Sequence, residues 1–418
     1  MSRLRWLKLV LLRYYRDMGL RVLLYALLSL AATLISPFAN ALLDESLKAK
    51  IDFSAVMAVL TILASSMLAV STFSLNIMVS AHRAAADAAT PRVHRILLED
   101  TTTQSVLAAF IGAFVYSLGS IVLYRLGFYP EDAAFVMMMI TTLVVIWVVV
   151  SLLRWIQHLT TLGSVEASLD AARGRAREAL LSLARHPRYG ASPLTGETVL
   201  PQETTPLPAP QSGFLQLIDM AKLEDCLPQG AAIYLDMRPG SHVLERQVIA
   251  QVSGTVDAGT LERLGKTFTF GRIRTHEQDA RFSLAVLSEI ASRALSPGIN
   301  DPGTAIEAVL ALKSVLWDYT LQTPDPDAPA APRVFAAFPD PADLLEAGFA
   351  AIARDGAGTV EVALALRQSL AALAAADAPD MARAARAFAD VALDASAAAA
   401  LPRRDMEQLE AVAMPGAD

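Results

Sequence analysis

The sequence predicts a membrane α-helical bundle with four transmembrane helices, followed by a C-terminal cytosolic α+β domain with an alanine-rich helical end. The first observation is composition, because 54% of the 418 residues are hydrophobic, only 18% are charged, and the mean hydropathy is +0.41. A soluble domain usually carries about 25% charged residues. The second observation is a set of four long apolar runs without charge. The third is a change of composition after residue 153.

The net charge divides unevenly between the two parts of the chain. Residues 1–153 carry 12 Lys and Arg against 9 Asp and Glu, whereas residues 154–418 carry 23 against 33. The net charges of the two parts are therefore +3 and −10, and their sum is −7. Because a nucleic-acid binder needs a basic face, no nucleic-acid partner is predicted. The single cysteine, Cys226, excludes an intrachain disulfide and a thiolate metal cluster, and we predict no cofactor and no metal site.

The four apolar runs cover residues 22–43, 53–81, 101–124 and 133–153. Each is long enough to cross the hydrocarbon core, which takes about 20 helical residues. They predict a four-span transmembrane domain over residues 22–153. Residues 1–21 form a basic amphipathic segment, which predicts either a helix at the inner membrane interface or a cytosolic extension of the first span.

The distribution of Lys and Arg predicts the orientation of the spans. Basic residues gather before the first span, between the second and third spans, and after the fourth span. The positive-inside rule therefore places both termini in the cytosol. These residues are Arg3, Arg5, Lys8, Arg13, Arg16, Arg21, Arg83, Arg92, Arg95, Arg154, Arg173, Arg175 and Arg177.

The second span is the most polar of the four. At about 100° per residue, Ser65, Thr72, Asn76 and Ser80 fall within a stripe of roughly 80°. We name these four residues the polar stripe and treat them as candidate pore-lining residues. Hydroxyls and amides of this kind line a water-filled path or bond packed helices together, and both interpretations stay open. No span contains Asp, Glu, Lys, Arg or His, which argues against an ion-coupled transporter.

The C-terminal part divides into four segments. Residues 154–187 predict a connecting helix, residues 188–212 a Pro-rich linker, residues 213–270 a small β-containing module, and residues 271–418 a helical cytosolic module. Strands are predicted at 213–218, at 233–237 with half-buried alternation, and at 248–252, with a turn at Pro239-Gly240. A further Pro, Asp and Ala linker is predicted at residues 324–332.

Residues 268–302 are the most informative segment of the C-terminal part. Thr275 and Gln278 have the spacing of a capping box, and Asp301-Pro302 has the form of a helix N-cap followed by proline. The corner Ser296–Asp301 therefore joins a helix end to a helix start, either as a structural corner or as an anion site. The ligand or regulatory candidates are Arg272, Arg274, His276, Asp279, Ser296, Gly298, Asn300 and Asp301.

The same segment carries a family resemblance, together with Phe73-Ser74 and Thr90-Pro91-Arg92. Arg274-Thr275 and Gln278-Asp279 lead to the string Ala-Leu-Ser-Pro-Gly-Ile-Asn-Asp-Pro at 294–302 and to Thr304-Ala305. In these residues the chain resembles a bacterial family of predicted membrane proteins, domain of unknown function 2254 (DUF2254). The resemblance implies the four-span layout and a bacterial inner membrane, and it brings no activity with it. Residues 80–87 depart from the Gln-rich pattern of the family.

Two functions fit these observations. The first is a homo-oligomeric ion or small-solute channel with a cytosolic regulatory domain, because the polar stripe needs a symmetry axis to enclose a path. The second is a membrane-anchored sensor or interaction module that binds a small ligand at the Ser296–Asp301 corner. No catalytic motif occurs, so we do not expect an enzyme. The predicted partners are the lipid bilayer, further copies of the chain, and an ion or small molecule.

Overall fold

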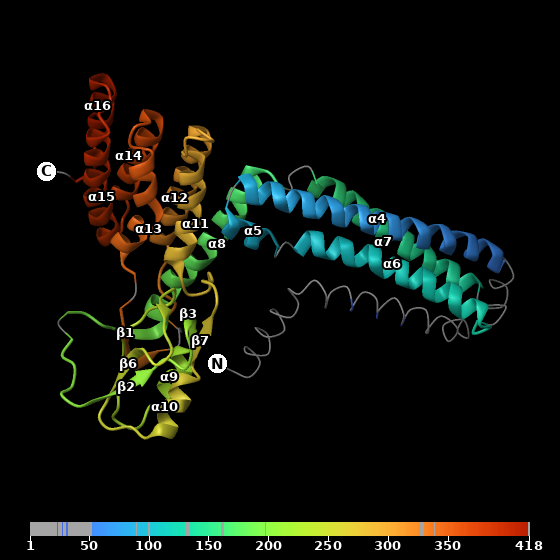
Figure 1. The fold of residues 1–418 in the computed structure, drawn as a ribbon, viewed down its shortest axis with the longest axis horizontal. Helices are drawn as coiled ribbons and strands as arrows, with labels where there is room; N and C mark the ends of the chain where they lie inside the picture. Colours follow the sequence, from blue (N-terminus) through green and yellow to red (C-terminus); the bar gives the residue numbers. More distant parts are fainter. Residues whose placement is uncertain are drawn as a thin grey trace. The chain divides into compact units, whose positions relative to one another are not determined.

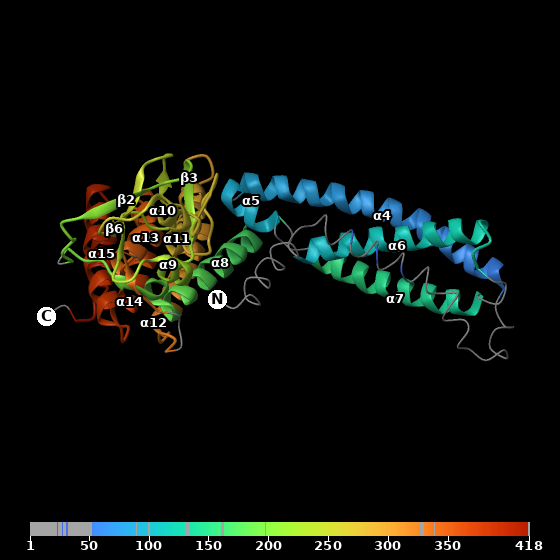
Figure 2. The ribbon, with the colours of Figure 1, turned by 90° about the horizontal axis from the view of Figure 1, so that it is seen from below.

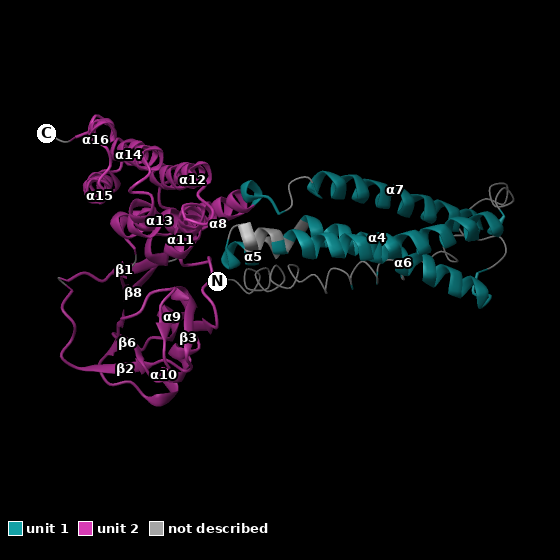
Figure 3. Cartoon of the chain, turned by 45° about the horizontal axis from the view of Figure 1, so that its top comes forward, with its two compact units in different colours: residues 1–167 teal, residues 168–418 magenta. Residues whose placement is uncertain are grey.

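The computed structural model describes residues 52–416, except 89, 99–100, 130–133, 160–162, 197, 327–329 and 338, together with Leu23, Leu27 and Ala31. The chain divides into two compact units, residues 1–167 and residues 168–418 (Figure 3). The predicted amphipathic segment 1–21 and, apart from Leu23, Leu27 and Ala31, the predicted first span 22–43 lie outside the described residues.

Three long helices run side by side in the first unit (Figures 1 and 2). They are α4 (Phe53–Ala88), α6 (Thr101–Arg125) and α7 (Ala134–Leu159), with the short α5 (Pro91–Leu98) between the first two in the sequence. Phe53–Ala81, Thr102–Arg125 and Ala134–Leu159 are long and apolar enough to cross a membrane. Three of the four predicted spans therefore form helices of the required kind.

The three helices pack through a regular apolar seam. On α4 the buried residues Phe53, Val56, Leu60, Leu63 and Met67 recur at spacings of three and four, which keeps one face of the helix against its neighbours. On the outer faces, large apolar side chains are exposed instead, as a hydrocarbon solvent requires. They include Ile62, Phe73, Leu143, Trp147 and Leu153.

The predicted connecting helix 154–187 is wrong as a continuous element. The helix α7 ends at Leu159 and α8 covers Val165–Arg185. Gly163 has φ +84°, a left-handed conformation that a helix interior does not allow. Ser164 then caps α8, because its Oγ accepts a hydrogen bond from the N–H of Ala167 at 3.0 Å.

The second unit contains two β-sheets. The first has the strand order β1-β8-β4-β6-β2, in which β8 runs parallel to both β1 and β4 and the other pairs are antiparallel. The second is antiparallel with the order β5-β3-β7. The strands are β1 (Ala191–Pro193), β2 (Thr204–Pro208), β3 (Gly213–Ile218), β4 (Ile233–Leu235), β5 (His242–Val243), β6 (Val248–Ser253), β7 (Phe268–Gly271) and β8 (Ala331–Ala336).

The strands predicted at 213–218 and 248–252 are confirmed as β3 and β6. Three other expectations need correction. The predicted linker 188–212 contains the 3-10 helix η2 (Pro187–Gly190), β1 and β2, and the predicted linker 324–332 runs into β8. The first sheet thus draws strands from both sides of the predicted module 213–270. The strand β4 is buried at all three positions because it lies between β8 and β6.

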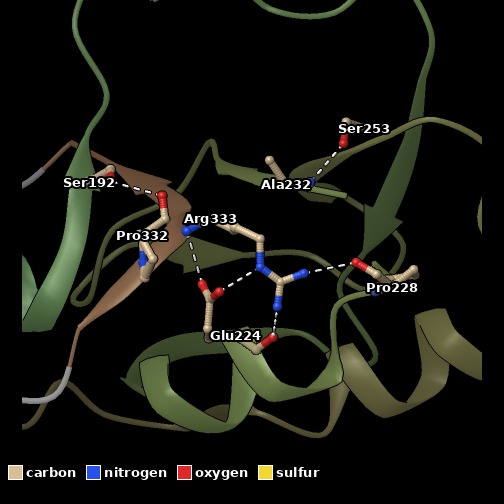
Figure 4. Close-up of polar contacts among 7 residues, drawn as sticks. All are labelled: Ser192, Glu224, Pro228, Ala232, Ser253, Pro332 and Arg333. Carbon is tan, nitrogen blue, oxygen red and sulfur yellow. Dashed lines mark hydrogen bonds and ion pairs between the residues drawn. The ribbon is translucent and has the colours of Figure 1, made fainter. Parts of the chain in front are cut away.

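Arg333 fastens strand β8 to helix α9 (Met220–Cys226), as Figure 4 shows. Its Nε donates to the Glu224 carboxylate at 2.6 Å, and its Nη atoms donate to the carbonyls of Glu224 and Pro228. The backbone N–H of Arg333 donates to the same carboxylate at 3.0 Å. On the other edge of β8, the Ser192 hydroxyl donates to the Pro332 carbonyl at 2.9 Å. One arginine therefore satisfies carbonyls at and just after the C-terminal end of α9 and links this helix to an interior strand of the sheet.

Helices form the rest of the second unit (Figure 1). The short α10 (Ala258–Gly265) precedes β7. The remaining helices are α11 (Ala280–Ala294), α12 (Pro302–Thr320), α13 (Pro341–Asp355), α14 (Val360–Ala374), α15 (Pro379–Ala398) and α16 (Arg403–Glu410). Their buried faces carry alanine together with larger apolar residues such as Leu312, Phe349 and Leu370.

Candidate functional site

The polar stripe lies on the exposed face of α4. All four of its residues, Ser65, Thr72, Asn76 and Ser80, are exposed. At about 100° per residue they face roughly away from the buried seam of the same helix. The described helices of the first unit therefore leave this face uncovered.

Two of the three hydroxyls of the polar stripe, those of Ser65 and Thr72, are satisfied within α4, whereas the hydroxyl of Ser80 has no hydrogen bond to any described residue. Ser65 Oγ donates to the Thr61 carbonyl at 3.0 Å, and Thr72 Oγ1 donates to the Leu68 carbonyl at 2.9 Å. These bonds stay within one helix, which serine and threonine achieve easily. The Asn76 side chain has no hydrogen bond to any described residue. Since its amide offers two donors and an acceptor, it needs water or a second helix in a membrane.

A second group of candidates gathers at the start of α11. Asp279 is 4% exposed and is the N-cap of the helix, since its Oδ1 accepts from the Phe282 N–H at 3.0 Å. Arg274 donates through Nε and Nη2 to Asp279 Oδ2 at 2.8 and 2.7 Å. The guanidinium also lies over the Phe282 ring, 4.8 Å from its centroid. Arg272 is exposed.

The predicted capping box at Thr275 and Gln278 is wrong, because Asp279 caps the helix. The Gln278 side chain instead bonds both polar groups of the Ile218 backbone, accepting from the N–H at 2.8 Å and donating to the carbonyl at 3.1 Å. Gln216 in β3 donates to the Ile273 carbonyl at 2.8 Å. Our sequence reasoning missed both glutamines as fasteners of this segment. A polar residue inside the otherwise apolar strand 213–218 was the available signal for Gln216.

His276 belongs to the same buried group. Its Nδ1 lies 2.9 Å from Ser283 Oγ, and its ring packs on Phe282 with a centroid distance of 4.8 Å. Burial lowers the pKa of His276 to about 4, and the nearby cations Arg175 and Arg274 act in the same direction. Burial also raises the pKa of Asp279, against the opposing effect of Arg274. Arg274 and Asp279 therefore bond to each other, and His276 bonds to Ser283.

The low pKa of His276 predicts a loss of stability in mild acid. The folded protein binds this proton near pH 4 and the unfolded chain near pH 6.5, so the unfolded state gains the proton first as the pH falls. The full contribution is present above pH 6.5. We expect about 3 kcal/mol to be lost between pH 6.5 and 4, at 1.36 kcal/mol per unit of pKa.

Denaturant unfolding of the wild type and of His276→Asn, at pH 7 and pH 4.5, measures this loss. Asparagine keeps a hydrogen-bonding group beside Ser283 without a proton to gain. Subtracting the two pH profiles removes the opposite contribution of Asp279, whose raised pKa favours the folded state in acid. Parallel profiles for the two proteins would contradict the prediction.

The Ser296–Asp301 corner is built as predicted at the start of α12. Asp301 is the N-cap, and its Oδ1 accepts from the Thr304 N–H at 3.1 Å, with Pro302 in the first turn. The N–H groups of Asn300 and Asp301 donate to the carbonyls of Ser296 and Ala294. Asn300 has φ +51°, which asparagine tolerates better than most residues. Gly298 and Asn300 are exposed, and Ser296 Oγ donates to the Arg293 carbonyl.

The Ser296–Asp301 corner and the candidates around Arg274 lie at opposite ends of α11. The cluster of Arg274, His276 and Asp279 precedes α11, and the corner follows it, so the 15 residues of the helix separate them by about 22 Å at 1.5 Å per residue. Asp301 itself occupies the donors that an anion at the start of α12 would use. Asn76 in the polar stripe and Asn300 in the corner are both exposed candidates whose side-chain amides have no hydrogen bond to a described residue. Of the two, only Asn76 lies on a helix that is long and apolar enough to cross a membrane.

The first unit contains three helices that are long and apolar enough to cross a membrane, and the second unit contains two sheets and several helices. These features define the chain as a predicted membrane protein. The chain belongs to the family of predicted membrane proteins called DUF2254, whose sequence profile matches residues 16–372. It is similar to uncharacterised proteins of Mycobacterium tuberculosis and Mycobacterium bovis, at 30% identity over 301 residues. The match covers 68% of this chain and 57% of the length of these relatives. No solved structure matches the chain.

Proposed function

We propose that this protein is a homo-oligomeric channel for ions or small solutes in a bacterial inner membrane, and that residues 168–418 form its cytosolic regulatory part. The activity we propose is passive transport rather than enzyme catalysis. One observation carries the proposal. The polar stripe of α4 is exposed on the side of the helix away from the packed seam.

A polar face of this kind is unfavourable against lipid tails. The hydrocarbon core supplies no hydrogen-bond partner, and an unsatisfied polar group there costs several kcal/mol. Within the polar stripe, Asn76 has the most donors and acceptors without a hydrogen bond, since the hydroxyls of Ser65 and Thr72 already donate within α4. Water in a central path satisfies the amide. Three or four spans enclose little space alone, so the path would form where copies of the chain meet at a symmetry axis.

The basic residues support a cytosolic position for the second unit. Arg83 on α4 is exposed and continues the polar stripe by one turn. Arg92 and Arg95 lie on α5, between the second and third predicted spans, and Arg154 lies just after the fourth. Basic residues near span ends favour the cytosolic side. The second proposed function, a ligand sensor at the Ser296–Asp301 corner, loses its support because Asp301 fills the donors of that helix start.

A cysteine series tests the channel. The chain has a single cysteine, so Cys226→Ala gives a cysteine-free background into which Asn76→Cys and Leu143→Cys are placed. Leu143 on α7 is 63% exposed and serves as the lipid-facing control. In planar bilayers we expect a water-soluble thiol reagent to lower the conductance of Asn76→Cys by about tenfold or more, equivalent to a barrier higher by about 1.4 kcal/mol. The Leu143→Cys variant should keep its conductance.

Two outcomes would overturn the channel. One is the absence of conductance and solute flux at every voltage and membrane tension tested. The other is an Asn76→Cys side chain that forms disulfides between copies but never reacts with the water-soluble reagent. That second result would make the polar stripe a dry packing face between helices, which the same residue types also support.

A further inference from the structure

Helix α12 carries large apolar side chains on its exposed face. Leu310, Trp317 and Leu321 are 44%, 37% and 64% exposed, and Leu321 is the C-cap residue, whose backbone is still helical. At about 100° per residue the three lie within roughly 40° of one another, on the side of the helix opposite the buried Leu312. We name these three residues the α12 stripe. Apolar residues that share one helix face indicate packing against a further element.

The helices of the second unit show that this face is unusual. The helix α14 packs on both α12 and α16, so α12 and α16 are the outer helices of one row (Figure 1). A row of packed helices that ends in water needs a polar outer face. The helix α16 has one, because its exposed residues are all charged or amide-bearing: Arg403, Arg404, Glu407, Gln408 and Glu410. The helix α12 exposes the α12 stripe instead.

The helix α8 lies beside the α12 stripe and leaves it exposed. Arg173 Nη2 donates to Ser314 Oγ at 3.1 Å, and Arg177 Nε donates to Asp318 Oδ2 at 2.6 Å. Ser314 and Asp318 are rotated by roughly 40° and 80° from Leu310 about the axis of α12. The polar groups on this flank are therefore bonded to α8, and the apolar face next to them remains available to another partner.

A second copy of α12 in antiparallel orientation is sterically complementary to this face. A two-fold axis beside Leu310 brings residues at equal distances before and after Leu310 to the same height in the two copies. Gly303 and Trp317 are each seven residues from Leu310, so Gly303 of one copy lies opposite Trp317 of the other. Beyond its chain neighbours, a β-carbon at Gly303 would have only Asp301 Oδ1 within 4 Å. The small residue therefore leaves space for the indole ring.

The charges beside the α12 stripe favour the same orientation. Glu307 is exposed and Lys313 is partly buried, and neither forms an ion pair with a residue in the described part of the chain. Both are three residues from Leu310, so the antiparallel arrangement brings Glu307 of one copy to the height of Lys313 of the other. A parallel arrangement would place the two Glu307 side chains at the same height, where like charges repel.

We propose that the α12 stripe is a contact surface for a second copy of this chain, packed antiparallel about a two-fold axis beside Leu310. The contact rests on the homo-oligomer of the proposed function and names the surface through which the second units meet. One helix face buries less than the roughly 800 Å² per partner of a typical stable complex. The contact therefore adds to the association of the membrane helices and does not replace it.

Disulfide formation by the full-length protein in its membrane tests this contact. In the Cys226→Ala background, we expect mild oxidation to link Leu310→Cys into a dimer, because a disulfide needs α-carbons within about 7 Å. Leu321→Cys is the matched control, since it lies on the same stripe and is more exposed. The two copies of residue 321 would lie about 33 Å apart, at 1.5 Å per residue for 11 residues on each side of the axis. This variant should stay monomeric on a non-reducing denaturing gel.

Three outcomes would overturn the proposal. Dimers of both variants would indicate parallel pairing or random collision, and dimers of Leu321→Cys alone would indicate a different axis. Dimers of neither variant would mean that lipid or another protein covers the stripe. Because the gel does not depend on conductance, a protein that cross-links without conducting would overturn the channel alone. A protein that conducts without cross-linking at Leu310→Cys would overturn this contact alone.

Discussion

Gly240→Ala should unfold or nearly unfold the second unit. A β-carbon at this position would lie 2.0 Å from Oδ2 of the buried Asp279 and 3.1 Å from Nη2 of Arg274. Gly240 also has φ +90°, a conformation that costs an L-residue about 1–2 kcal/mol. Overpacking adds about 1–3 kcal/mol, and displacing the buried ion pair adds more. We expect a total loss of about 4 kcal/mol or more, a large share of the usual stability of about 5–15 kcal/mol.

Gly230→Ala is the matched control for this substitution. Gly230 has φ +76°, and beyond its chain neighbours no atom lies within 4 Å of the position that an alanine β-carbon would take. It therefore reports the backbone cost alone, about 1 kcal/mol. Calorimetry of the full-length protein in detergent measures both variants. Equal shifts of the melting temperature would show that Asp279 does not lie against Gly240.

Asp279→Ala should be the second most damaging change. It removes the N-cap of α11, which is worth about 0.5–2 kcal/mol, and leaves Arg274 without its carboxylate. Because the Arg274 side chain is 32% exposed, water recovers part of the lost ion pair, and we expect a total loss of about 3 kcal/mol. Asp279→Asn keeps the capping oxygen and should lose about half as much.

Asp301→Ala separates the two contributions of Asp279. Asp301 caps α12 in the same way, but it is exposed and pairs with Thr304 rather than with an arginine. We expect a loss of about 1 kcal/mol, from the cap alone. Urea unfolding of the three variants measures the differences. A loss in Asp279→Ala no greater than that in Asp301→Ala would mean that the buried ion pair contributes nothing.

Local patterns identified the elements that depend on local rules. The apolar runs at 53–81, 101–124 and 133–153 predicted helices because length and hydrophobicity decide whether a segment can cross a bilayer. Asp301 followed by Pro302 predicted a helix start because the N-cap and its first turn involve only neighbouring residues. The prediction of Thr275 as a cap failed because Thr275 and Asp279 both precede the same apolar face.

Elements that depend on contacts between distant residues could not be predicted from local sequence patterns. The first two residues of strand β8, Ala331 and Pro332, fall in the predicted linker 324–332 because alanine and proline lack strand character. Strands β1 and β4 nevertheless pair with β8, and Arg333 anchors it. The positions of Gly240 and Gln278 also gave no local sign of their contacts with Asp279 and Ile218.

The sequence by itself determined which segments are apolar and long enough to cross a bilayer and which residues form the polar stripe. It also determined that a helix begins after Asp301. These properties follow from composition and from periodicity within a single helix. Only the tertiary structure decided that the stripe is exposed, that Asp279 is buried against Arg274, and that the Ser296–Asp301 corner lies a full helix away from that pair. Burial and pairing depend on side chains brought together from distant parts of the chain, and no local pattern records them.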